Sequence, residues 1–181
     1  MKRKSIISLS RGFTMIEIVF VIVILGIFAS LAVPRLATNK EDAQISQLKA
    51  QIAAIRAGII DYANQQRLAG KSEKDIYPKQ LENGEPKNRP NLFEYVLPTP
   101  IKSNNADRDT ILKIQGWSDK ADDYETRYMY STGNLKTASE VIVMVYCSPI
   151  ITSDPECEKD YQGTFICLEG CDKIKEKQYK K

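Results

Sequence analysis

The chain has 181 residues, a formal net charge of +3 and no histidine. This length suggests one globular domain plus the N-terminal apolar segment, and the lack of histidine removes the commonest general base and the commonest metal ligand. Basic residues are concentrated in residues 1–12, so the remainder carries about −1 and gives no electrostatic argument for nucleic-acid binding. They are Lys2, Arg3, Lys4 and Arg11.

The segment from Phe13 to Val33 is apolar apart from Glu17. At 1.5 Å per residue a helix of this length reaches about 30 Å, which is enough to span a bilayer. A lone acid near the end of such a helix is costly and therefore indicates a function. An ordinary membrane anchor leaves Glu17 unexplained. A secretory signal cleaved after Ser30-Leu31-Ala32 is disfavoured by the length of the run and by its acid.

Within the next region, residues 37–70, an amphipathic helix is predicted over residues 39–69. Apolar residues recur there at intervals of three and four, which places them on one stripe that we expect to pack on a sheet. They are Ile45, Leu48, Ile52, Ile55, Ile59 and Tyr62. The sequence leaves open whether the helix starts afresh at Asn39 or continues through Pro34, and Gly70 ends it.

Residues 71–110 are punctuated by proline and glycine, and they predict a connector with one short helix near Asn91–Val96. Residues 111–171 predict an antiparallel sheet. Its first candidate is the β-prone run Thr110–Gln115. The alternation from Tyr124 to Tyr130 predicts a half-buried strand whose tyrosines pack on the helix, and a turn follows at Ser131-Thr132-Gly133-Asn134.

The last two strand candidates are Val141–Tyr146, apolar on both faces and therefore central, and Thr164–Leu168. Residues 172–181 form a charged tail that we expect to be frayed. A long N-terminal helix packed on a small antiparallel sheet is an α+β layout.

Four cysteines lie in the last part of the chain: Cys147, Cys157, Cys167 and Cys171. An even, clustered set predicts two disulfides if this region lies in an oxidising compartment. Zinc is disfavoured because there is no paired C-x-x-C and no histidine. Of the three possible connectivities we favour the local one, Cys147–Cys157 and Cys167–Cys171.

No catalytic or cofactor site is expected. With no histidine a nucleophile–base triad would need unusual partners, and no phosphate-binding glycine loop is present. The acidic cluster of Asp119, Asp122 and Asp123 is interpreted as a solvated turn because it lacks the alternation with glycine that calcium loops favour, although calcium stays open.

The stretch Arg11-Gly12-Phe13-Thr14-Met15-Ile16-Glu17 sets a basic residue, a glycine, an aromatic residue and a carboxylate at the start of the apolar run. It resembles the class III signal peptide of type IV prepilins and of the pseudopilins of type II secretion. The resemblance is specific over residues 11–36 and extends loosely, as architecture, to about Gly70. It implies the same α+β, pilin-like fold.

The resemblance also implies residue roles. A prepilin peptidase would remove the leader, residues 1–12, by cutting between Gly12 and Phe13, and Phe13 would be N-methylated. Glu17 stands where the family has a glutamate that directs assembly. Gly26 and Pro34 stand where family members have residues that soften the helix, within a membrane or filament-core segment over residues 13–36.

A non-enzymatic filament subunit follows as the expected function, in a type II secretion-like system. The basic leader keeps the N-terminus in the cytoplasm, so the chain crosses the bacterial inner membrane once and places its C-terminal domain in the periplasm or in a filament. The expected partners are the prepilin peptidase, like subunits, minor pilins and an inner-membrane assembly platform. A type IV pilus or competence pseudopilus, used for adhesion or DNA uptake, and a membrane-tethered protein that does not polymerise are the alternatives.

Overall fold

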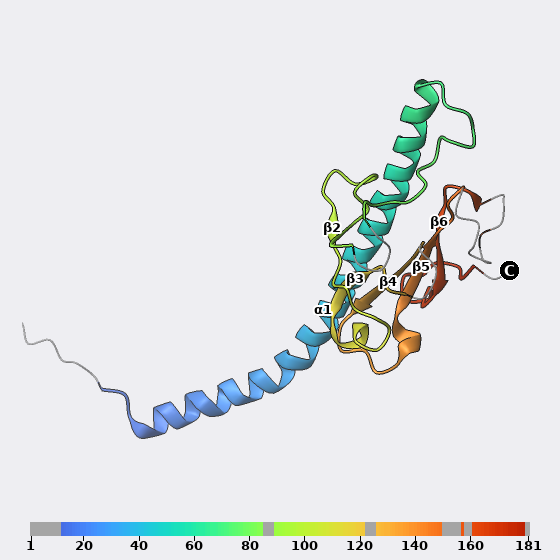
Figure 1. Cartoon of the computed structure of the whole chain (residues 1–181). Coiled ribbons are helices and arrows are strands. Elements are labelled where there is room, and N and C mark those ends of the chain that lie inside the picture. The colour runs from blue at the N-terminus through green and yellow to red at the C-terminus, as the bar shows by residue number, and fades with distance from the viewer. Residues whose placement is uncertain (1–11, 85–88, 122–125, 150–156, 158–160, 180–181) are drawn as a thin grey trace, which may run out of the picture. The chain divides into compact units, whose positions relative to one another are not determined.

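The computed structural model in Figure 1 describes residues 12–84, 89–121, 126–149, 157 and 161–179, with the backbone alone for residues 30–39. The fold is α+β, a long N-terminal helix with a small antiparallel sheet, as predicted. The chain divides into two compact units, Met1–Asp42 and Ala43–Lys181, and each is described by itself.

Helix α1 (Met15–Leu68) is continuous through Pro34, so no new helix begins at Asn39. It ends where the sequence predicts. Gly70 has a φ of 75°, and the amide of Lys71 donates to the carbonyl oxygen of Gln66 at 3.1 Å. Only glycine adopts this left-handed conformation without steric cost, which makes it the usual residue after a helix.

The part of α1 in the second unit packs on the sheet through the predicted stripe. Leu48, Ile52, Ile55 and Ile59 are at most 1% exposed, while Ile45 is partly buried against the same core. The indole nitrogen of Trp117 donates to the side-chain oxygen of Gln51 at 2.9 Å and links the helix to the sheet. The stripe from Ile45 to Ile59 is therefore core, as expected, whereas Tyr62 is only partly buried.

The sheet has four strands in the order β3 (Gln115–Ser118), β4 (Arg127–Thr132), β5 (Ile142–Tyr146) and β6 (Phe165–Glu169). All neighbours are antiparallel, with Tyr130 opposite Trp117 and Ile142 opposite Tyr130. Every residue of β5 is buried, which confirms the prediction of a central strand. The prediction of a last strand near Thr164–Leu168 is also confirmed, one residue later.

The prediction of a half-buried strand is wrong for β4, because both of its faces are covered. Tyr128 and Tyr130 belong to the core beneath α1, as expected, but Met129 is fully buried in a second core on the other face. That second core includes Ile111 and other residues from outside the sheet, which alternation within the strand does not reveal. Tyr124 lies outside the described residues.

The connector contains no helix at Asn91–Val96, which corrects that prediction. Strands β1 (Asn91–Leu92) and β2 (Ile101–Lys102) pair there instead, and a turn follows Phe93, whose φ is 65°. Phe93 is fully buried and its ring meets that of Trp117 edge to face at 5.5 Å. Tertiary packing of one aromatic residue thus decides the local conformation.

The run Thr110–Gln115 is also not a strand. It forms the 3₁₀ helix η1 (Ile111–Lys113), and β3 begins only at Gln115. The carboxylate of Asp107 accepts hydrogen bonds from the amide of Thr110 at 2.9 Å and from its hydroxyl at 2.7 Å, which favours a helical turn. A second 3₁₀ helix, η2 (Ala138–Glu140), precedes β5.

Both disulfides are present with the local pairing, Cys147–Cys157 and Cys167–Cys171. Residues of the tail between 172 and 179 are held by hydrogen bonds to the domain, so the expectation of fraying is wrong for this part. The amide of Tyr179 donates to the carbonyl oxygen of Cys167 at 3.0 Å, and Arg56 binds Glu176 through two hydrogen bonds of 2.7 and 2.8 Å.

Candidate functional site

The start of α1 brings Gly12, Phe13, Thr14 and Glu17 together. The amide of Glu17 donates to the hydroxyl of Thr14 at 3.3 Å, and the amide of Thr14 donates to the Glu17 carboxylate at 3.5 Å. This reciprocal pair is a capping box, which stabilises a helix N-terminus. The spacing Thr14-x-x-Glu17 carries that signal in the sequence, although the assembly role predicted for Glu17 did not include it. Glu17 therefore has a local role within its own chain.

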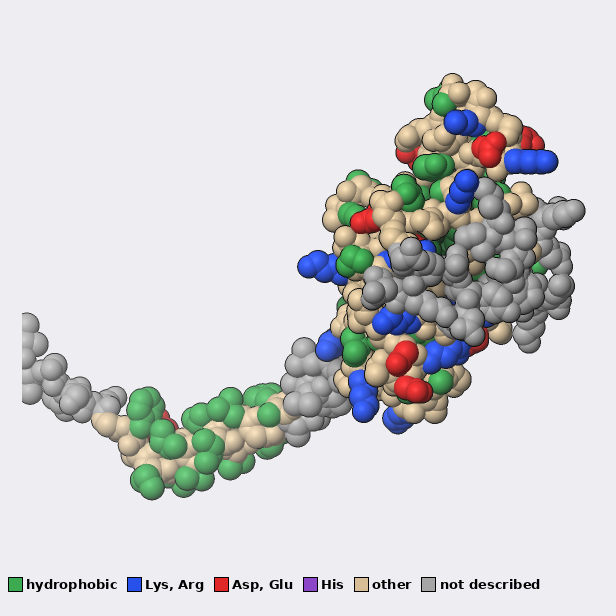
Figure 2. Space-filling view, viewed as in Figure 1, with side chains coloured by type: hydrophobic (Ala, Val, Ile, Leu, Met, Phe, Trp, Pro, Cys, Tyr) green, Lys and Arg blue, Asp and Glu red, His purple; other side chains and the backbone are tan. Residues whose placement is uncertain are grey.

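Large apolar side chains flank this site and continue along the helix, and they are exposed. Phe13, Met15 and Ile16 are 78%, 85% and 74% exposed, and Phe20 and Phe28 are each 64% exposed. Figure 2 shows hydrophobic side chains gathered along the N-terminal part of α1. An apolar surface of this length exceeds what monomeric soluble proteins normally leave uncovered, so it marks an interaction surface.

In the described part of the chain, no helical stretch is both long and apolar enough to cross a membrane. Gly26 lies within α1, and a Cβ atom added there would meet nothing within 4 Å. Close packing within the unit therefore does not require glycine at this position. Pro34 lies in the helix, and its side chain is outside the described residues.

A second acid, Glu82, lies fully buried in the domain, and no local pattern in the sequence predicts it. Its carboxylate accepts hydrogen bonds from Arg89 at 2.5 Å and from the hydroxyl of Tyr128 at 2.9 and 3.1 Å. The amide of Phe93 donates to it at 3.4 Å. Arg89 is itself 1% exposed. In the sequence these residues look like ordinary members of a polar connector.

Burial governs the electrostatics of this cluster. Loss of solvation raises the pKa of Glu82 to about 7, against the lowering effects of Arg89, Tyr128 and the Phe93 amide. Burial and the neighbouring Glu82 carboxylate also raise the pKa of Tyr128 well above its usual value. The cluster joins the connector to β4 inside the core, so its geometry indicates a structural function.

The acidic cluster does not form a metal site within the described residues, where no group of three acidic, cysteine or histidine side chains converges. Asp119 is 2% exposed and accepts a 3.4 Å hydrogen bond from the hydroxyl of Ser103. Its surroundings are thus not those of a solvated turn. Asp122 and Asp123 lie outside the described residues.

The N-terminal helix that leaves its apolar surface exposed, together with a helix-on-sheet domain, defines the pilin-like class of α+β proteins. Residues 7–33 match the family described as "Prokaryotic N-terminal methylation motif". This match covers Gly12, Phe13, Glu17 and Gly26. Together with the relatives that follow, it shows that the N-terminal part of the chain is similar to the type IV pilin and type II secretion pseudopilin family.

Curated relatives carry the name "Type II secretion system core protein G". The protein of Klebsiella pneumoniae is 46% identical over 52 residues, which are 29% of this chain and 37% of that protein. The protein of Pectobacterium carotovorum subsp. carotovorum is 37% identical over 83 residues, 44% of this chain and 53% of that protein. The chain thus spans about a third to a half of the length of the relatives it matches. No solved structure gives a significant match.

Proposed function

We propose that this chain is a pseudopilin, a structural subunit that assembles into a filament of a type II secretion-like system. The observation that carries the proposal is the exposed apolar part of α1 with Glu17 at its start, within the match to a methylation motif. A role in packing subunits together explains why this surface stays uncovered within one chain.

Before assembly, the membrane is the apolar phase that would cover this surface. Counted from the sequence, which includes positions whose side chains the structure does not describe, the run Phe13–Val33 would be long enough to span a bilayer as a helix, and the basic leader would hold the N-terminus on the cytoplasmic side. Residues 43–181 would then fold in the periplasm. That compartment permits disulfides such as Cys147–Cys157.

Cleavage between Gly12 and Phe13 would create a new cationic amine within a short distance of Glu17. In the filament, the Glu17 carboxylate of one subunit would pair with the methylated Phe13 amine of a neighbour. An acid inside an apolar helix bundle is costly without a partner, so subunits would be driven into the register in which the pair forms. Gly26 and Pro34 would let the segment bend as it leaves the membrane.

The partners proposed from the family are a prepilin peptidase, like subunits and minor pilins, and an inner-membrane assembly platform. Secretion is preferred over adhesion or DNA uptake because the curated relatives are named for type II secretion. A deletion strain scored for both secretion and transformation separates these systems. Loss of transformation with normal secretion would favour the competence pseudopilus.

Two substitutions separate the roles of Glu17. Glu17→Gln keeps an acceptor for the Thr14 amide and so preserves the capping box, but it removes the charge. Glu17→Ala removes both. Because the proposed pair needs a charge, we expect both variants to insert and to be cleaved, and to lose incorporation into sheared filaments by at least about tenfold.

Mass spectrometry of the N-terminal peptide checks processing in the same samples, where we expect the mature chain to begin at N-methyl-Phe13. Normal assembly of Glu17→Gln with failure of Glu17→Ala would assign Glu17 to helix capping alone. Normal assembly of both would remove the basis of the proposal, and a membrane-tethered protein would then explain the chain better.

A further inference from the structure

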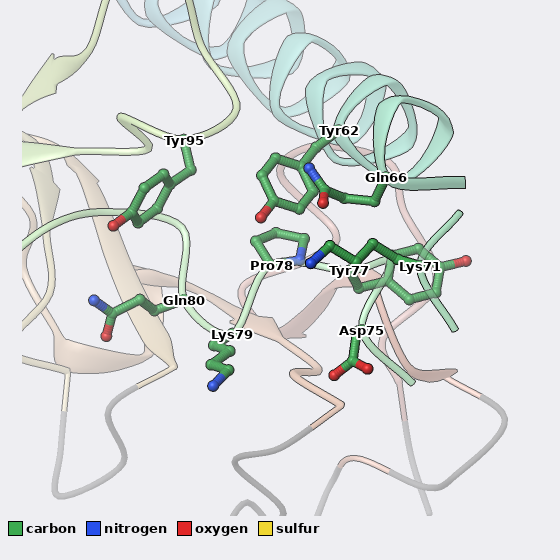
Figure 3. Close-up of a pocket in the computed structure, with 9 residues that line it drawn as sticks. All are labelled: Tyr62, Gln66, Lys71, Asp75, Tyr77, Pro78, Lys79, Gln80 and Tyr95. Atoms are coloured by element: carbon green, nitrogen blue, oxygen red, sulfur yellow. The ribbon is translucent and has the colours of Figure 1, made fainter. Parts of the chain in front are cut away.

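A cleft of about 730 Å³ lies between the C-terminal end of α1 and the beginning of the connector (Figure 3). Its volume falls in the range of about 300–1,000 Å³ that is typical of small-ligand sites. The rim is open to solvent, because Lys71, Asp75 and Lys79 are exposed. All of the lining residues belong to the unit of residues 43–181, so the cleft does not depend on the N-terminal helix segment.

Three tyrosine rings line the cleft. Tyr62 comes from α1, Tyr77 from the connector and Tyr95 from the turn after β1. Figure 3 shows Tyr95 on one side and Tyr62, Pro78 and Tyr77 on the other. Two amide side chains lie among the rings, Gln66 and Gln80. The cleft thus alternates flat apolar faces with groups that both donate and accept hydrogen bonds.

The backbone that lines the cleft is held in place by hydrogen bonds from β5 and from the residues that follow it. The hydroxyl of Tyr146 donates to the carbonyl oxygen of Pro78 at 2.6 Å, and the hydroxyl of Ser148 donates to that of Lys79 at 2.6 Å. Tyr146 is fully buried at the end of β5. The connector segment is therefore fixed to the central strand, and the cleft is formed before any ligand arrives.

Two of the rings are also held in orientation. The ring of Tyr77 rests against Gly163, where a Cβ atom would overlap it. The hydroxyl of Tyr95 donates to the side-chain oxygen of Asn83, and its amide donates to the carbonyl oxygen of Leu81 at 3.0 Å. A ring that is fixed in the free protein loses little side-chain entropy on binding, which favours recognition of a ligand by stacking.

We propose that this cleft binds a short stretch of a carbohydrate chain. The C–H faces of sugar rings pack on tyrosine rings, and sugar hydroxyls both donate and accept hydrogen bonds, as the amides of Gln66 and Gln80 do. Asp75 accepts hydrogen bonds from sugar hydroxyls and the two lysines donate to them.

Nucleic acid fits the same cleft less well. Lys71 and Lys79 are offset by Asp75, which leaves one excess positive charge at the rim. Proteins that bind single strands without sequence preference combine aromatic stacking with a continuous basic groove along the phosphates. A sugar polymer of low charge needs no such groove.

The test uses the full chain in detergent micelles and isothermal titration calorimetry. The probes are chitotetraose and cellotetraose, with an oligothymidine of matched length as the comparison. We expect at least one sugar to bind with a Kd of about 10 µM to 1 mM. Tyr62→Ala and Tyr95→Ala should each weaken that binding by about fivefold or more, and Tyr62→Phe by less than about twofold, because the ring is retained.

Tyr161→Ala is the matched control, because Tyr161 is not among the residues that line the cleft and its ring meets that of Tyr179 edge to face. It should bind the same sugar as tightly as the parent chain. If Tyr62→Ala or Tyr95→Ala is unfolded at the temperature of the titration, Gln66→Ala and Lys71→Ala at the rim supply the same comparison. We expect each of these two to weaken the binding of the sugar by about threefold.

Absence of binding to both sugars at about 10 mM overturns the proposal, as does sugar binding that none of the cleft variants weakens. Tighter binding of oligothymidine, weakened by the same variants, would reassign the cleft to nucleic acid and also overturn it. The measurement is made on dispersed subunits. A failure of filament assembly therefore does not affect it, and its own failure leaves the assembly proposal standing.

Discussion

Two glutamates in apolar surroundings distinguish the two units of the molecule. Glu82 is fully buried in residues 43–181 and is held by Arg89, Tyr128 and the amide of Phe93. Glu17 lies on an exposed apolar helix, and within the described residues its hydrogen bonds are those of the capping box with Thr14. The domain satisfies its acid internally, whereas the N-terminal helix leaves both its acid and its apolar face available to another molecule.

The largest expected effect on stability concerns Glu82, the buried acid that is paired with Arg89. Arg89→Met removes the cation that is paired with buried Glu82, and we expect a loss of about 3–5 kcal/mol in the free energy of unfolding at pH 8. Glu82 would then have to stay protonated, so its pKa should rise further and the loss should be smaller at pH 5. Chemical denaturation at the two pH values measures the difference.

The double variant Glu82→Gln/Arg89→Met serves as the control. It removes both charges and keeps acceptors for Tyr128 and for the Phe93 amide, so it should recover most of the lost stability and lose the dependence on pH. Equal stability of the single and double variants would show that the pair is not what holds the connector to β4.

The parent chain should itself become less stable as the pH rises. Glu82 has a folded-state pKa of about 7 against an ordinary value of 4.5, so the folded state holds the proton more tightly. This contribution is complete below pH 4.5 and is lost as the pH rises to 7, by about 3 kcal/mol at most. Unfolding free energies at half-unit pH steps test it, with the double variant as reference.

Two other acids, Asp107 and Glu140, should affect stability in a lower range of pH than Glu82 does. Hydrogen bonds from Thr110 lower the pKa of Asp107, and a hydrogen bond from the amide of Lys136 lowers that of Glu140. Groups of this kind favour the fold above their ordinary pKa and lose that effect as the pH falls. A stability curve that rises from pH 5 to 7 and is the same in the double variant would contradict the role given to Glu82.

Two glycines of α1 allow the two units to be compared by one substitution in each, Gly26 in the first unit and Gly58 in the second. A Cβ atom at Gly58 would overlap the carbonyl oxygen of Val96, where the connector crosses the helix closely. Gly58→Ala should therefore cost about 1–3 kcal/mol of unfolding free energy. At Gly26 a Cβ atom meets nothing within 4 Å, so Gly26→Ala should raise the helicity of its segment, as alanine is the better helix former.

Circular dichroism and thermal melting of both variants check this pair, and sheared-filament content shows whether Gly26 is needed for bending during assembly. A Gly58→Ala chain as stable as the parent would show that the connector can shift away from the helix. Normal filaments from Gly26→Ala would remove helix softening as the reason for this glycine.

The sequence was most informative where one local pattern determined one element. The stripe from Leu48 to Ile59 and the doubly apolar β5 were predicted correctly, because periodicity reports burial directly. The resemblance at Gly12–Phe13 and Glu17 likewise rested on one contiguous stretch. Spacing alone left three connectivities of the four cysteines open, and the local pairing that we favoured among them is the one in the structure.

The structure of the connector could not be predicted from the sequence, because it depends on contacts with residues that are far away in the chain. In the sequence, Glu82 and Arg89 resemble solvated charges. In the structure both side chains are buried, and Glu82 accepts a hydrogen bond from the hydroxyl of Tyr128. The aromatic Phe93 adopts a positive φ because its ring fills the core. The cleft has the same origin, since Tyr62, Tyr77 and Tyr95 are brought together only by tertiary contacts.

The smallest expected effect concerns the tail. Arg56 donates two hydrogen bonds to Glu176 and one to the carbonyl oxygen of Phe165 at 2.9 Å, but the pair is partly exposed, at 37% and 29%. Solvent screens such pairs, so Glu176→Gln should change the free energy of unfolding by less than about 1 kcal/mol.

The local effect should be larger than the global one, because residues 172–179 follow the last strand and segments at a chain end open more readily than the sheet. Carboxypeptidase should therefore trim Glu176→Gln faster than the parent chain, with an unchanged melting temperature. Glu73→Gln removes an exposed acid elsewhere in the domain and should change neither measurement. Equal trimming of all three chains would show that the backbone hydrogen bond from Tyr179 to Cys167, and not the ion pair, holds the tail.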